Sequence, residues 1–121
     1  GGVILRECHL GRDSLVAVTM VLNRMSQSKN TVSDIYNSLP QYKIVKDKIN
    51  IEGLDKNKLL SKVNDLFDGV ENNTIDGLKF IWDDKWIHLR SSNTEPIMRI
   101  YAEATSENVA KELVIKVKNL L

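Results

Sequence analysis

Cysteine is nearly absent from the 121-residue sequence, which contains only Cys8. A single thiol excludes an internal disulfide and a cluster of thiolate metal ligands, and it fits a reducing, cytoplasmic setting. Cys8 stands in an apolar stretch, so we expect it to be buried and inert. Long apolar runs are absent as well: none approaches the roughly 20 residues that cross a membrane, and no signal peptide opens the chain. We therefore expect no membrane partner.

A strong net charge is also lacking. Seventeen Lys and Arg against 16 Asp and Glu give a formal charge of +1. This balance excludes the broad basic face of a nonspecific nucleic-acid binder, so we expect no nucleic-acid partner and only a local anion site. With 42% hydrophobic and 27% charged residues, the composition is typical of a globular chain with one core and a short appended segment.

Two helices are predicted before Pro40. Apolar residues recur at helical spacing over residues 12–28, and Asp13 is placed to cap this helix. Thr31 and Asp34 have the spacing of a capping box at the start of a second, short helix. The first helix has a wide apolar arc, which predicts burial against a larger body. Without such a body, we expect residues 1–28 to drive self-association.

The remaining residues predict an α+β domain. Two helices are expected, one opened by Asp55 and one capped by Thr105 or Ser106, and Asp76-Gly77 is a signal for a tight hairpin turn. Their order with the strands favours an antiparallel four-stranded sheet covered on one face by two helices. The expected strands cover residues 41–52, 78–82, 85–90 and 97–104.

One polar loop concentrates the groups that bind phosphate. Arg90 and Arg99 bracket it, and their planar guanidinium groups match phosphate oxygens. Ser92, Asn93 and Thr94 add side-chain donors, and consecutive backbone N–H groups can form an anion-binding nest. These residue types also occur in ordinary hairpin loops, so the residues alone leave both interpretations open.

The two histidines carry no predicted catalytic role. Neither His9 nor His88 has a carboxylate or nucleophile at a motif spacing. The lysines of residues 43–62 predict a solvated face, and they keep open one alternative from another class, a noncatalytic RNA- or protein-binding α+β module.

The loop sequence brings in a family resemblance. Residues 90–103, RSSNTEPIMRIYAE, resemble the phosphate-binding loop in the C-terminal domain of the α-D-phosphohexomutases, which comprise phosphomannomutases, phosphoglucomutases and phosphoglucosamine mutases. Residues 1–4 and 10–13 are similar to the end of the family's sugar-recognition loop and to the last strand and helix of its third domain. The resemblance implies that residues 1–29 are a remnant of the third domain and residues 30–121 the fourth domain, with a fold like the TATA-box-binding protein.

The resemblance also implies a function. Family members interconvert hexose 1-phosphates and 6-phosphates with a phosphoserine and a Mg²⁺ ion, both held by domains that precede this region. The phosphate that is not reacting would be bound by Arg90, Ser92, Asn93 and Thr94, with Arg99 as an addition. The expected partners are a phosphosugar and the upstream domains, and the chain alone is expected to be inactive. Asn93 favours phosphomannomutase/phosphoglucomutase over phosphoglucosamine mutase, but the preferred hexose stays open.

Overall fold

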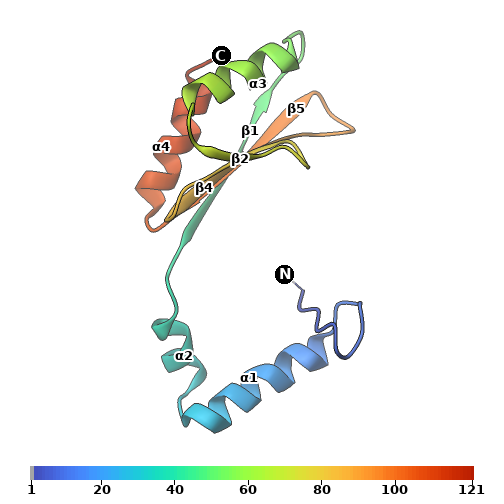
Figure 1. Cartoon of the computed structure of the whole chain (residues 1–121), viewed down its shortest axis with the longest axis vertical. Helices are drawn as coiled ribbons and strands as arrows, with labels where there is room; N and C mark the ends of the chain where they lie inside the picture. Colours follow the sequence, from blue (N-terminus) through green and yellow to red (C-terminus); the bar gives the residue numbers. More distant parts are fainter. Residues whose placement is uncertain (1) are drawn as a thin grey trace. The chain divides into compact units, whose positions relative to one another are not determined.

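The chain is divided between Pro40 and Gln41 in a computed structural model that describes residues 2–121 (Figure 1). The first unit is Gly1–Pro40 and the second Gln41–Leu121. Both helices that precede Pro40 therefore belong to the first unit. How these units correspond to the third and fourth domains of a longer enzyme stays a prediction.

The helices of the first unit, within the described residues 2–40, are α1 (Ser14–Ser28) and α2 (Val32–Ser38). Asp13 caps α1 by accepting backbone N–H bonds from the next turn, at 2.8 and 3.0 Å. Thr31 and Asp34 form the predicted capping box at the start of α2. Both starting points are confirmed because each is set by hydrogen bonds within four residues.

Two predictions for the start of the chain are wrong. The strand that the resemblance implies before the first helix is not formed by residues 2–13, and Cys8, which we expected to be buried, is exposed. A strand needs a neighbour that accepts its backbone hydrogen bonds, and within this unit the Val3 carbonyl only accepts the N–H of Asp13, at 3.0 Å. No side chain of α1 or α2 is buried, and Leu15 is 76% exposed. No helix of residues 2–121 has the length and apolar character to span a bilayer.

The second unit is the predicted α+β fold, with five strands instead of four. Its antiparallel sheet has the order β1-β5-β4-β3-β2, and both helices lie on one side of it (Figure 1). The additional strand is β2, a short polar edge strand that the hydrophobic pattern did not reveal. The elements are β1 (Lys43–Asn50), α3 (Lys56–Leu66), β2 (Glu71–Asn73), β3 (Leu78–Ile81), β4 (Lys85–Ser91), β5 (Ile97–Ala104) and α4 (Glu107–Lys118).

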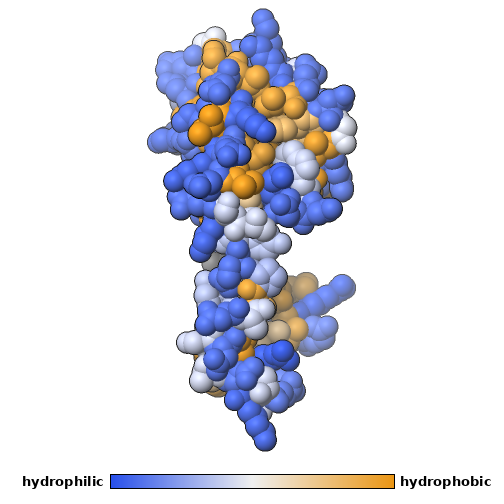
Figure 2. Space-filling model, turned by 90° about the vertical axis from the view of Figure 1, so that its left-hand side faces the viewer, coloured by the Kyte–Doolittle hydropathy of each residue, from blue (hydrophilic) through white to orange (hydrophobic). Residues whose placement is uncertain are grey.

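Alternation along the strands separates a buried face from an open one. Ile87 and Leu89 of β4 and Met98 and Ile100 of β5 are fully buried beneath the helices. The residues between them in sequence therefore lie on the opposite, open face of the sheet. On the helix side, Figure 2 shows hydrophobic residues between hydrophilic ones on the surface of the second unit. The open face carries Trp86, His88, Arg90, Arg99, Tyr101 and Glu103.

Strand β1 pairs with β5 without interruption from Lys43 to Asn50, so residues 46–48 form no bulge. Asp47 lies on the helix side of β1, where Lys118 of α4 donates to its Oδ2 at 2.8 Å. Lys46 and Lys48 consequently lie on the open face.

The ion pair between Asp47 and Lys118 predicts a loss of stability in acid. The hydrogen bond from Lys118, and then the one from the Lys48 backbone N–H, lower the pKa of Asp47 below its ordinary value of 3.8. A carboxyl whose pKa is lower in the folded chain contributes stability above its unfolded pKa and loses it as the pH falls through the folded pKa. Asp47→Asn should therefore lower the free energy of unfolding at pH 7 by up to ~1 kcal/mol, because both side chains are partly exposed, and by less at pH 2.5.

Urea unfolding of both proteins at the two pH values measures this difference. Asp83→Asn, in the exposed β3–β4 turn, is the control. An equal effect of Asp47→Asn at both pH values would contradict the prediction.

Candidate phosphate-binding site

The predicted loop joins β4 to β5 and has its two arginines side by side. In the β4–β5 register Arg90 lies directly opposite Arg99, and both are exposed on the open face. The Ser92 backbone N–H donates to the Ile97 carbonyl at 2.9 Å and closes the loop at its base. Two arginine residues thus flank the base of a short polar loop.

The hydroxyl groups inside the loop are only weakly engaged. Ser92 Oγ and Thr94 Oγ1 are 3.4 Å apart, and the Thr94 backbone N–H lies 3.4 Å from Ser92 Oγ. Hydrogen bonds of this length are weak, so these groups retain capacity for a ligand. Asn93 is exposed between them at the tip of the loop. The structure therefore places Ser92 and Thr94 together and Asn93 at their side.

A carboxylate that the sequence analysis did not assign to the site contacts Arg90. Asp76, from the turn between β2 and β3, has its Oδ1 3.1 Å from Arg90 Nε. The main-chain carbonyl of the same residue accepts a hydrogen bond from Nε2 of His88, the next open-face residue of β4. Asp76 is thereby attached to β4 at two points. It engages one edge of the guanidinium group and leaves the other donors of Arg90 available.

Gly77 is what allows this turn to approach β4. Its φ is +93°, and a Cβ atom built on it would lie 2.2 Å from the carbonyl oxygen of Leu89. No side chain fits at that distance, so only glycine lets Asp76 reach Arg90. The Asp76-Gly77 pair predicted a turn. That Gly77 also lets Asp76 reach Arg90 was not predicted, because it depends on which strand the turn contacts.

The prediction that His9 lacks a carboxylate partner is wrong. His9 Nδ1 accepts the Gly11 backbone N–H at 2.9 Å, so the proton on Nε2 is donated to Asp13 Oδ2, also at 2.9 Å. This hydrogen bond, with those from the helix N-terminus, lowers the pKa of Asp13. The pair belongs to the cap of α1 in the first unit. It is a structural contact within that unit.

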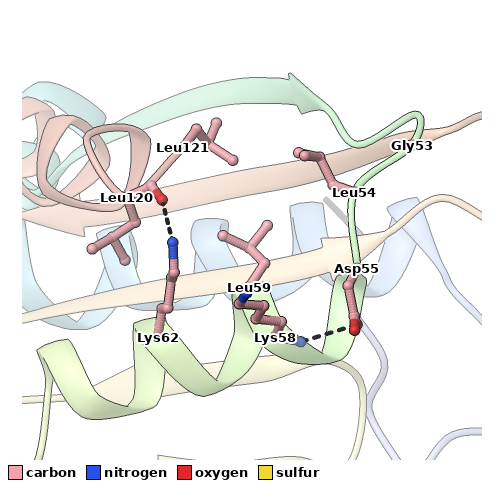
Figure 3. A pocket seen from close by; sticks show the side chains of 8 residues that line it. All are labelled: Gly53, Leu54, Asp55, Lys58, Leu59, Lys62, Leu120 and Leu121. Atoms are coloured by element: carbon pink, nitrogen blue, oxygen red, sulfur yellow. Dashed lines mark hydrogen bonds between the residues drawn. The ribbon is translucent and has the colours of Figure 1, made fainter.

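A separate hollow lies at the start of α3 and the end of the chain (Figure 3). Leu54, Leu59 and Leu121 give it an apolar wall, and Lys62 Nζ donates to the Leu120 carbonyl at 3.2 Å. None of the five predicted phosphate ligands lines it. The loop between β4 and β5 remains the candidate site.

The second unit is an α+β domain with helices on one face of an antiparallel sheet and a loop flanked by two arginines. The family model for the C-terminal domain of phosphoglucomutase/phosphomannomutase matches residues 45–120. The chain therefore belongs to the phosphoglucomutase/phosphomannomutase family and contains its C-terminal domain, which confirms the resemblance seen in the sequence.

Similar proteins carry more than one name. A phosphoglucomutase/phosphomannomutase of Thermococcus kodakarensis is 39% identical over 93% of this chain and 25% of the relative. A phosphoglucosamine/phosphogalactosamine mutase of Sulfurisphaera tokodaii is 33% identical over 100% of this chain and 27% of its own length. The crystal structure of a phosphoglucomutase/phosphomannomutase family protein from Burkholderia thailandensis superimposes on 98% of this chain with a TM-score of 0.68 at 27% identity, and the match covers 26% of that protein. The chain spans about a quarter of the length of these relatives.

The close approach of Gly77 to β4 yields a stability prediction with an internal control. Gly53 also has a positive φ, +74°, but a Cβ there would meet nothing within 4 Å. Gly53→Ala should cost about 1 kcal/mol of unfolding free energy, the ordinary cost of a left-handed backbone. Gly77→Ala should cost at least about 2 kcal/mol more, because a backbone clash is added to the same strain. Urea unfolding of both variants measures the difference, and equal costs would contradict the proposed role of Gly77.

Proposed function

We propose that this chain is the phosphate-binding part of a phosphohexomutase, an enzyme that interconverts hexose 1-phosphate and hexose 6-phosphate. In this role the β4–β5 loop holds the phosphate that is not reacting. The observation that supports the proposal most directly is the juxtaposition of Arg90 and Arg99 beside the weakly engaged hydroxyls of Ser92 and Thr94. Like charges opposite each other on a sheet repel, and a bound phosphate converts that repulsion into attraction.

Each group has a distinct part in this binding. Arg90, with Asp76 on one edge, presents its remaining N–H donors in a fixed plane, which suits two phosphate oxygens. Ser92, Asn93 and Thr94 supply short, directional donors. These groups all bind the phosphate and make no contact with the sugar ring, so the loop accepts either end of a hexose bisphosphate. The same site can then serve both directions of the interconversion.

The remaining chemistry is assigned to the upstream domains. Phosphoryl transfer requires a positioned phosphoryl donor and neutralisation of charge, and Mg²⁺ supplies that neutralisation when bound. Among residues 2–121, no group of three or more His, Cys, Asp or Glu side chains that could hold a metal ion is found. We assign no step of the reaction to a metal within this chain. Asn93 favours mannose or glucose phosphates as substrates, with glucosamine phosphate as the alternative.

The open face argues against RNA binding as the function. A stacking platform for single-stranded nucleic acid needs aromatic rings that are available to bases. The Trp86 ring is covered by the Lys79 ammonium group, 4.5 Å from its centroid, and its Nε1 donates to Glu103 at 3.0 Å. Tyr101 lies beneath Lys46 at 5.9 Å. These two aromatic residues of the open face are thus already engaged.

Titration with inorganic phosphate and with glucose 6-phosphate tests the binding function. Amide shifts recorded by NMR should move at Ser92, Asn93 and Thr94. Arg90→Lys should raise the dissociation constant about tenfold, because one ammonium group cannot replace a planar pair of donors in a charged hydrogen bond. Arg24→Lys, in α1, is the control. A saturating response elsewhere with none in the loop would contradict the proposal, as would a tighter, salt-dependent affinity for single-stranded RNA.

A second prediction concerns activity. The 121-residue chain should not convert mannose 1-phosphate, glucose 1-phosphate or glucosamine 1-phosphate to the 6-phosphate, even with Mg²⁺ and a hexose bisphosphate present, because this chain holds only the distal phosphate. Coupled assays or ³¹P NMR measure the product. Turnover by the purified chain would show that the transfer chemistry lies within these residues.

A further inference from the structure

A third cation lies in line with the two arginines of the site. The β1–β5 register places Lys48 opposite Arg99, and the β4–β5 register places Arg99 opposite Arg90. All three lie on the open face, which alternation assigns to every second residue of these strands. We call Lys48, Arg99 and Arg90 the cation row. Adjacent strands are about 4.8 Å apart, so the row spans roughly 10 Å of backbone with Arg99 at its centre.

The cation row is only partly neutralised. Asp76 pairs with Arg90 at 3.1 Å, but within residues 2–121 no carboxylate forms an ion pair with Lys48 or Arg99. Asp47, next to Lys48 in sequence, lies on the helix side of the strand and binds Lys118. Directly opposed like charges are unfavourable, and an anion bound between them removes the repulsion. The positive charge of the cation row is therefore only partly balanced by carboxylates, and a bound anion would balance the rest.

The surface beside the cation row is hollowed. Lys46, Asp47, Lys48, Arg99 and Tyr101 line a shallow depression over β1 and β5. Arg99 is thus shared between this depression and the mouth of the β4–β5 loop. Lys48 is one strand spacing, about 4.8 Å, from Arg99 in this register, which is a distance that a lysine side chain can cover toward a phosphate bound at the loop.

We propose that Lys48 is a further phosphate-binding residue, so that the site extends from the β4–β5 loop across β5 to β1. This inference rests on the proposed function. Lys48 supplies a mobile ammonium group opposite the planar donors of Arg90, and Arg99 lies between them. The ligand is a phosphate monoester with oxygens exposed on more than one side, because it is contacted by the loop from one end and by the cation row from the open face.

Substitution of Lys48 tests the inference against a matched neighbour. Lys46 lies on the same strand and the same face, about 7 Å further from the loop. Lys48→Gln should raise the dissociation constant for inorganic phosphate and for glucose 6-phosphate about tenfold, the value of one charged hydrogen bond. Lys46→Gln should raise it less than about threefold, because screening weakens an interaction across solvent. Lys48→Arg should restore binding.

The outcomes separate this inference from the proposed function. If loop amides respond normally in Lys48→Gln, the role of Lys48 is wrong and the phosphate site stands. If both glutamine variants lose affinity equally, the attraction is general and Lys48 is not a ligand. If the loop amides of the unmodified chain do not respond, the proposed function itself fails. Amide spectra of each free variant establish that the fold is retained.

Discussion

The register between β4 and β5 is the constraint on which the site depends. Ile87 and Leu89 on one strand and Met98 and Ile100 on the other are fully buried, so a slip of one residue would move apolar side chains onto the open face. The same register fixes which residues lie opposite each other on the open face of the sheet. Arg90 faces Arg99 because the core requires their neighbours to point the other way. Burial of the core therefore specifies the arrangement of charges on the opposite face.

A second constraint comes from the β2–β3 turn. Gly77 lets the turn approach β4, and Asp76 then contacts both Arg90 and His88. The site consequently combines two hairpins: one provides the loop and the arginines, and the other holds one arginine in orientation. Neither hairpin alone would position the guanidinium group, because an exposed arginine side chain has several rotatable bonds and many accessible rotamers.

The sequence predicted what depends on local spacing and missed what depends on distant pairing. Asp13, Thr31 and Asp55 begin helices as expected, since a cap is decided within one turn. Strand β2 carries no apolar alternation and exists because β3 offers it a partner. Ile75, the apolar residue next to the Asp76-Gly77 pair, is 91% exposed in the turn and adds nothing to the core. The loop residues were found because they are adjacent in sequence, whereas Asp76 comes from the β2–β3 turn and Lys48 from β1.

Magnitudes explain how a fold can maintain opposed cations. A like-charged pair on a sheet costs about 0.2–1 kcal/mol, whereas complete burial of one Ile or Leu contributes about 1.5–3 kcal/mol. One core side chain, such as Ile100, therefore offsets the repulsion between Arg90 and Arg99. Folding does not require a carboxylate beside Arg99, and a carboxylate there would compete with any anionic ligand. The absence of such a partner for Arg99 within residues 2–121 is thus compatible with stability and leaves its donors available for phosphate.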